Sequence, residues 1–210
     1  SDFKNYPQTL EEDLQIAQTT GVDVVFVPTP EDLYGGKPQA DKVDWGSVTS
    51  DFEAAYRPGH FDGVVAVVDR LFTAVKPHIG FFGEKDLQQV AVIKKLAKDR
   101  HPQIHIRSCP LIRDEEGLAL SSRNTRLSEE GKQSALSLSQ SLSRIKSSVN
   151  TKAQIEKERE VLKDNIDVEI EYLEGVNEVS YSKKDSPESW THVIIAAEVE
   201  GVRLIDNIRL

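Results

Sequence analysis

Apolar residues recur along the first half of the chain with two distinct spacings. In three segments, near residues 9–20, 62–75 and 86–98, they return at every third or fourth position, and this spacing predicts helices. Short runs rich in β-branched and aromatic residues predict strands at 22–27, 78–82 and 104–109. The run at 22–27 is apolar on both faces, as in a buried parallel strand. The repeated strand–helix order predicts an α/β fold with a doubly wound parallel sheet.

The pattern changes after Pro110. Residues 129–149 and 152–162 have helical patterns. Residues 168–173 alternate with a period of two, and residues 193–197 and 202–205 predict two further strands around the turn at Glu200 and Gly201. Helices and strands gathered in this way are typical of an α+β domain. We therefore expect two domains, residues 1–111 and residues 112–210.

The composition restricts the class of function. The 210-residue chain has a formal net charge of −9, which argues against a nucleic-acid partner bound through its phosphates. No apolar run approaches the roughly 18 residues of a membrane span, so no membrane partner is expected. The single cysteine, Cys109, excludes an internal disulfide and favours a reducing, cytoplasmic location. A small anionic ligand is compatible with the charge, because a few converging cations can hold one.

The segment Gly83-Glu84-Lys85-Asp86 lies at a predicted strand-to-helix junction. Ligands of an open parallel sheet bind beyond the carboxyl ends of its strands, and a helix N-terminus offers backbone N–H groups to an anion. Gly83 allows close approach to the main chain, Lys85 supplies a charge for phosphate, and Asp86 is expected to cap the helix. Gln89 lies one turn further along the same face. The simpler alternative is a capped helix with an exposed Glu–Lys pair.

Two further polar segments are candidates for ligand contacts. Residues 120–124, Leu-Ser-Ser-Arg-Asn, combine two hydroxyls with a guanidinium, which suits a triphosphate; taken alone, they are more simply a polar turn. Residues 57–63, Arg-Pro-Gly-His-Phe-Asp-Gly, predict a fixed turn in which Asp62 caps a helix and His60 bonds to the backbone. The other histidines show no metal-ligand spacing, so no metal site is predicted.

Taken in order, these segments resemble the pantothenate synthetase (pantoate–β-alanine ligase) family. The resemblance is carried by residues 82–89, Phe-Gly-Glu-Lys-Asp-Leu-Gln-Gln, and residues 117–124, Gly-Leu-Ala-Leu-Ser-Ser-Arg-Asn. Residues 57–64 and 204–208 match further family segments in the same order, and residues 175–190 fit least well. The resemblance covers nearly the whole chain. It implies a Rossmann-like, doubly wound parallel sheet followed by a small α+β lid domain.

The resemblance implies a ligase of pantothenate biosynthesis, on the way to coenzyme A, that works in two steps. Pantoate carboxylate attacks the α-phosphate of ATP to give pantoyl adenylate and pyrophosphate, and the amine of β-alanine then displaces AMP. Charge that builds on the phosphate would be stabilised by Lys85, Ser121, Ser122 and Arg123. Mg²⁺ bound to the phosphates would assist.

The resemblance also implies which residues bind each substrate. ATP would contact Gly83, Glu84, Lys85, Asp86, Ile112, Leu120, Ser121, Ser122 and Arg123, with Ile112 reaching the adenine through its backbone. Pantoate would contact Gln89, Val67 and Val68. The C-terminal domain would close as a lid that excludes water from the adenylate. The implied partners are these small molecules and a second copy of the chain in a homodimer.

Alternative functions stay open at this point. Another adenylate-forming or nucleotidyl-transferring enzyme of the same fold would share these features, since a fold does not define a substrate. A non-catalytic acidic interaction protein, or an inactive remnant, is the other alternative. The family's N-terminal strands carry a His-x-Gly-His nucleotide motif that this sequence lacks, because it begins where the family has passed both strands. The expected sheet is therefore N-terminally truncated.

We expect the 210-residue chain by itself to be inactive. A sheet without those strands would expose backbone edges and apolar faces. The check is an assay of AMP release from ATP with pantoate and β-alanine both present. AMP release that depends on both acids would contradict the expectation.

Overall fold

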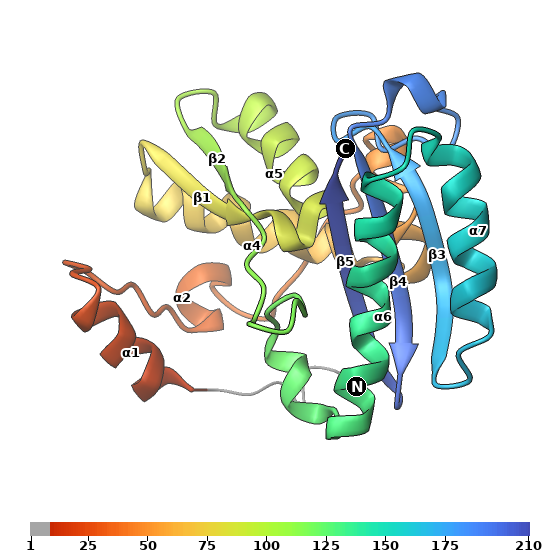
Figure 1. The fold of residues 1–210 in the computed structure, drawn as a ribbon. Helices are drawn as coiled ribbons and strands as arrows, with labels where there is room; N and C mark the ends of the chain where they lie inside the picture. The colour runs from red at the N-terminus through yellow and green to blue at the C-terminus, as the bar shows by residue number, and fades with distance from the viewer. Residues whose placement is uncertain (1–8) are drawn as a thin grey trace. The chain divides into compact units, whose positions relative to one another are not determined.

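The computed structural model describes residues 9–210, so residues 1–8 of the predicted N-terminal domain lie outside the described part. The chain divides between Pro38 and Gln39 into two compact units, residues 1–38 and 39–210. The first unit contains the helices α1 (Leu10–Thr19) and α2 (Pro30–Tyr34) (Figure 1). The predicted first helix is confirmed.

The strand predicted at residues 22–27 is wrong. These residues form no regular element, and their side chains are exposed, Val24 to 80%. A strand exists only where its backbone N–H and C=O groups pair with a neighbouring strand. Within residues 9–38 no second strand lies beside this run. The apolar composition of residues 22–27 therefore predicted a strand wrongly, because composition does not show whether a neighbouring strand is present to pair with it.

The first half of the second unit alternates helices with parallel strands. It contains α3 (Glu53–Tyr56), α4 (His60–Val75), β1 (Ile79–Gly83), α5 (Leu87–Arg100) and β2 (His105–Cys109), with short 3₁₀ turns η2 (Gly46–Thr49) and η3 (Glu84–Asp86). β1 and β2 pair in parallel, with Gly80 opposite Ile106. The helices and strands predicted here are confirmed, and the unit is α/β with a parallel sheet.

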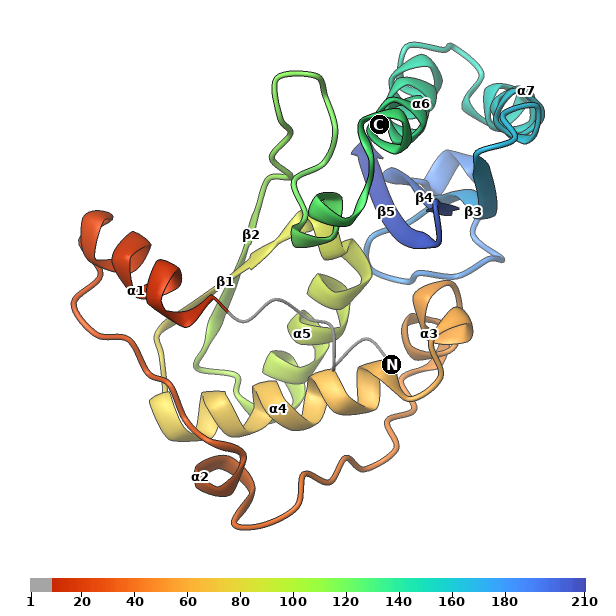
Figure 2. The same cartoon turned by 90° about the horizontal axis from the view of Figure 1, so that it is seen from below.

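The second half forms a separate antiparallel sheet with helices. Its elements are η4 (Ser122–Arg126), α6 (Glu129–Lys146), α7 (Thr151–Lys163), β3 (Val168–Val176), η5 (Pro187–Ser189), β4 (His192–Val199) and β5 (Val202–Arg209). The strands lie in the order β3-β4-β5. α6 and α7 cover one face of this sheet (Figure 2).

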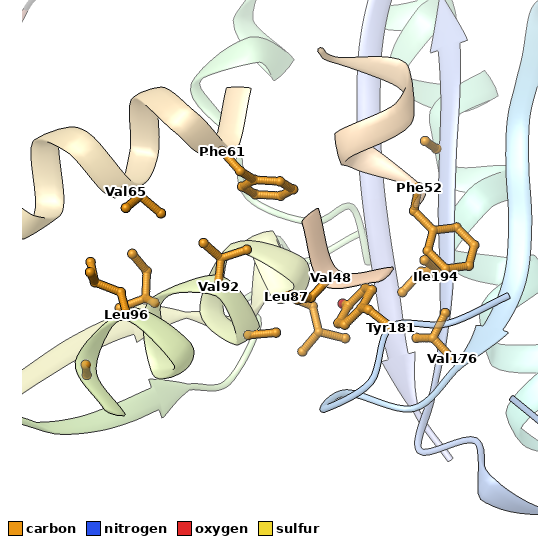
Figure 3. Close-up of a cluster of buried hydrophobic side chains, with 14 of the residues drawn as sticks. Val48, Phe52, Phe61, Val65, Leu87, Val92, Leu96, Val176, Tyr181 and Ile194 are labelled. Carbon is orange, nitrogen blue, oxygen red and sulfur yellow. The ribbon is translucent and has the colours of Figure 1, made fainter. Parts of the chain in front are cut away.

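β4, the central strand of the antiparallel sheet, is buried on both faces. On one side Val193, Ile195 and Ala197 of β4 pack in a cluster with α6 and α7. On the other side Ile194 and Ala196 join a second cluster that includes residues of η2, α4 and α5 (Figure 3). This second cluster takes residues from both sides of the predicted domain boundary at 111/112. The boundary itself stays a prediction.

A β-bulge at Glu171 changes which core the side chains of β3 enter. Ile170 pairs with Ala197 and Tyr172 pairs with Ala196, so Glu171 is an extra residue on β3. Before the bulge Val168 packs in the cluster of α6 and α7, and after it Leu173 takes that face. Tyr172 therefore turns to the opposite core, beside Phe52.

Candidate functional site

The Gly83–Asp86 segment is held in place by β5, the last strand of the antiparallel sheet. β1 ends at Gly83, η3 follows, and α5 begins at Leu87. Asn207 of β5 donates its side-chain N–H to the carbonyl oxygens of Glu84, at 2.7 Å, and Lys85, at 3.3 Å. Asp86 stands at the N-cap position, but its side chain makes no capping hydrogen bond, so the predicted cap is wrong. The residue follows a 3₁₀ turn with ψ of 59°, and its side chain lines a pocket instead.

The first pocket joins the Lys85 segment to the start of α4. The pocket is partly open to solvent, and its space of about 30 Å³ has room for water rather than for a whole substrate while the side chains keep these positions. Polar and charged groups dominate its wall: Glu53, Arg57, His60, Lys85, Asp86, Gln88, Gln89, Tyr172, Tyr181, Asp206 and Asn207. Tyr181 is fully buried, and its hydroxyl has no hydrogen-bond partner among the residues that the structure describes.

A second, smaller pocket brings Lys85 beside the Ser121 segment. Lys85, Ser121, Asn124, Arg203 and Asp206 line it together with apolar residues of α6 and β5. Lys85 and Asp206 line both pockets. Lys85 and Ser121, which are 36 residues apart in sequence, therefore line the same pocket. Lys85 stands where the two pockets adjoin.

A buried ionic network built on Arg203 lies between the pockets. Arg203 donates to both carboxylate oxygens of Glu53, at 2.9 and 2.6 Å, and to Glu171 through Nε and Nη2, at 2.7 to 2.9 Å. Tyr172 donates its hydroxyl to Glu53 at 2.6 Å. Burial opposes the charge on Glu53, but the hydrogen bonds and charge of Arg203 prevail and lower its pKa. These groups were missed in the sequence, since they lie up to 150 residues apart.

Asp206 forms a second buried ion pair. Arg113 donates to its two carboxylate oxygens at 2.7 and 2.9 Å, a bidentate geometry. Burial raises the pKa of Asp206, and Arg113 opposes that rise. Arg113 also donates to the carbonyl of Gly117, within the loop that leads to Ser121. The pair thus connects β5 to the loop that carries the Ser121 motif.

The residues before α4 differ in detail from the sequence expectation. The helix begins at His60, with Gly59 as N-cap at φ 79°, a left-handed conformation that favours glycine. Asp62 is inside the first turn and accepts from the backbone N–H of Val43 at 2.8 Å, so it is not the N-cap. His60 contacts the side chain of Arg57, whose Nη1 lies 3.1 Å from His60 Nε2. The imidazole was expected to bond to the backbone instead.

Ser121 lines the second pocket, whereas neither pocket is lined by Ser122, Arg123, Ile112 or Leu120. Ser121 caps η4 by accepting from the N–H of Arg123, and Ser122 is exposed. The carbonyl of Ile112 accepts from the N–H of Leu120 at 3.0 Å, and both side chains are exposed. Arg123 donates to the carbonyl of Arg203 at 3.5 Å.

Of the three residues predicted to bind pantoate, only Gln89 lines the first pocket. Gln89 lines the first pocket and makes no side-chain hydrogen bond within residues 9–210, whereas its neighbour Gln88 is buried and bonded to Glu53, Val48 and Asp51. Val68 packs against the core cluster, and Val67 is half-buried on α4. Neither valine lines the pocket, so their role stays a prediction.

Residues 9–210 contain neither a candidate metal site nor a candidate membrane-spanning helix. No group of three or more His, Cys, Asp or Glu side chains in that range is arranged to hold a metal ion. No helix in that range is long and apolar enough to cross a membrane.

The fold and site define an α/β protein with a polar site at the carboxyl end of a parallel strand, and comparison with known proteins gives the family. The family model described as pantoate-beta-alanine ligase matches residues 1–209. The chain belongs to this family.

Individual relatives agree with the family match. The chain is 41% identical to a pantothenate synthetase from Acetivibrio thermocellus, covering 99% of this chain and 75% of the relative. It is 40% identical to one from Corynebacterium glutamicum, covering 100% and 77%. The crystal structure of pantothenate synthetase from Thermus thermophilus matches with a TM-score of 0.90 at 34% identity, covering 100% and 77%. A Francisella tularensis pantoate-beta-alanine ligase, complexed with beta-gamma ATP and beta-alanine, matches with a TM-score of 0.78 at 31% identity, covering 99% and 72%.

Glu53 should make stability depend on pH. Its folded-state pKa is lowered, so ionisation favours the fold above the ordinary glutamate value of about 4.3 and this gain is lost as pH falls through the folded value. Glu53→Gln should lower the free energy of unfolding by about 3 kcal/mol at neutral pH, because it breaks a buried ion pair. Urea unfolding should show that the difference in unfolding free energy between Glu53→Gln and wild type becomes smaller near pH 3.

A matched control is Glu156→Gln, which removes an exposed partner of Arg159. It should change the unfolding free energy by less than about 1 kcal/mol at either pH. A gap between wild type and Glu53→Gln that stays constant with pH would contradict the assignment.

Proposed function

We propose that the protein containing this chain joins pantoate to β-alanine with ATP through the site around Lys85. Members of its family are pantoate–β-alanine ligases. The single observation that carries the assignment of this site is the position of Lys85. It stands where one pocket, lined by Gln89, adjoins another, lined by Ser121. A cation there can meet a phosphate and an organic acid at once.

The nucleotide part of the proposal rests on charge and access. Lys85, Ser121, Ser122 and Arg123 stabilise the charge that develops on the α-phosphate of ATP. Gly83 has a φ of −72° and open space where a Cβ would stand, so neither backbone strain nor packing requires glycine. Close passage of a ligand is the remaining reason for it. Glu84, Asp86, Ile112 and Leu120 complete the proposed ATP contacts, Ile112 through its backbone.

The acid part of the proposal rests on the contrast between Gln88 and Gln89. The amide of Gln88 is used by the fold, whereas the amide of Gln89 lines the pocket with no partner within residues 9–210. Gln89 therefore binds a pantoate oxygen, with Val67 and Val68 walling the apolar part of that substrate. The Francisella relative was solved with β-alanine as well as a nucleotide, which agrees with an amino-acid acceptor.

The remaining parts of the proposal follow from the reaction. Mg²⁺ accompanies ATP and neutralises its phosphates. Residues 112–210 act as a lid over a Rossmann-like domain that ends at residue 111, in a cytoplasmic homodimer. The lid excludes water because an acyl adenylate hydrolyses readily when water reaches it.

Lys85→Ala should weaken ATP binding at least tenfold in the natural protein that contains this chain. The variant removes a positive charge that faces the phosphates. Titration calorimetry measures the affinity, and pantoate-dependent pyrophosphate release measures the first step. Lys98→Ala, on an exposed face of α5, is the control and should leave both unchanged. Unchanged ATP affinity in Lys85→Ala would favour a non-catalytic protein.

Gln89→Ala should raise the KM for pantoate more than the KM for ATP. The substitution removes an amide that contacts only the acid, and leaving one substrate oxygen unpaired costs about 1–3 kcal/mol. Gln103→Ala, on the exposed loop after α5, is the matched control. Equal rises in the two KM values would show that Gln89 does not discriminate between the substrates.

A further inference from the structure

Arg57 and His60 form a polar pair on the wall of the first pocket. Arg57 Nη1 lies 3.1 Å from His60 Nε2. A guanidinium can only donate hydrogen bonds, so the Nε2 atom must carry a lone pair. The imidazole of His60 is therefore neutral, with its proton on Nδ1.

The surroundings of His60 keep it neutral near physiological pH. Burial lowers its pKa, and the charge of Arg57 adds to this effect. Glu53 and Asp86 raise the pKa and Arg123 lowers it, but the net direction is downward. None of these carboxylates is hydrogen-bonded to the ring. His60 is thus an unprotonated base on a pocket that Lys85 and Gln89 also line.

Arg57 has a second partner that allows it to release His60. Its Nη1 lies 3.7 Å from Glu53, a carboxylate that Arg203 also holds. Rotation of the guanidinium toward Glu53 exposes the lone pair of Nε2 without leaving Arg57 unpaired. The narrow space of about 30 Å³ requires some such movement before a substrate enters.

The second step of the proposed reaction needs a base. An aliphatic amine such as that of β-alanine is an ammonium ion at neutral pH and has no lone pair for attack. One proton must leave the nitrogen before it can attack the acyl carbon of the adenylate. A neutral histidine is the side chain best suited to accept that proton near pH 7.

We propose that His60 is the general base of the amide-forming step, which rests on the proposed ligase function. Nε2 of His60 takes one proton from the ammonium group of β-alanine. The freed amine forms the C–N bond to the pantoyl carbonyl carbon, and the bond from that carbon to the phosphate oxygen breaks. The second amine proton leaves with the departing AMP, and the imidazolium returns its proton to water.

His60→Gln separates this role from a structural one. The side-chain oxygen of glutamine can still accept the hydrogen bond of Arg57, but it cannot take a proton. Pantoate-dependent exchange of pyrophosphate into ATP should keep its wild-type rate. Conversion of preformed pantoyl adenylate by saturating β-alanine, followed by rapid quench, should fall by about 100-fold or more. The slow rate should recover as pH rises and free amine increases.

A control variant and the pH dependence of the two half-reactions test the role of His60 further. His105→Gln, exposed on β2, should change neither half-reaction. In the wild type, the β-alanine step should lose rate as pH falls below the ordinary histidine value of about 6.5, and pyrophosphate exchange should not. Equal loss of both half-reactions in His60→Gln, loss of neither, or a shared acid limb in the wild type would overturn the base role. All of these measurements use the natural protein, and absence of any pantoate-dependent exchange in its wild-type form would instead overturn the ligase assignment.

Discussion

Burial of both faces of β4, the central strand of the antiparallel sheet, is the interaction that holds the elements of residues 39–210 together. Successive residues of β4 enter opposite cores, so no residue between Val193 and Ala197 faces water. Each large apolar side chain buried this way contributes about 1.5–3 kcal/mol. Because the second core also contains α4 and α5, the sheet cannot shift without disturbing the helices that carry His60 and Gln89. Packing therefore couples the antiparallel sheet to the helices that carry these two residues.

The network that joins Arg203 to Glu53 and Glu171 needs the planar set of donors that only an arginine side chain has. Arg203 meets two carboxylates at once through its planar fork of donors. A lysine would offer one point charge and leave a carboxylate oxygen unpaired in a buried place. The bulge at Glu171 makes the arrangement available, because it turns Tyr172 toward Glu53 while Glu171 itself reaches Arg203.

Much of this fold could be predicted from the sequence, and the failures have a common cause. α4, α5, β1, β2 and the late strands carry clear periodic patterns, and local pattern is enough for them. The run at 22–27 failed because a strand depends on a partner that its own residues do not specify. Asp62 and Asp86 failed as caps because one hydrogen-bonds to Val43 and the other follows a 3₁₀ turn. In the site, Lys85 and Ser121 were found by motif, whereas Glu53, Arg203 and Asp206 are recognised only once distant segments meet.

The two hydrogen bonds from Asn207 to the carbonyls of Glu84 and Lys85 have a consequence for local unfolding. β5 is an edge strand of its sheet, and an edge strand opens more readily than a strand between two neighbours. Whenever the last residues of β5 detach, the Lys85 turn loses both anchors at the same moment. Under the proposed function, ligand affinity and opening of β5 are then linked quantities: a bound nucleotide slows amide hydrogen exchange in β5, and a substitution that loosens the end of β5 weakens nucleotide binding without touching a ligand-contacting side chain.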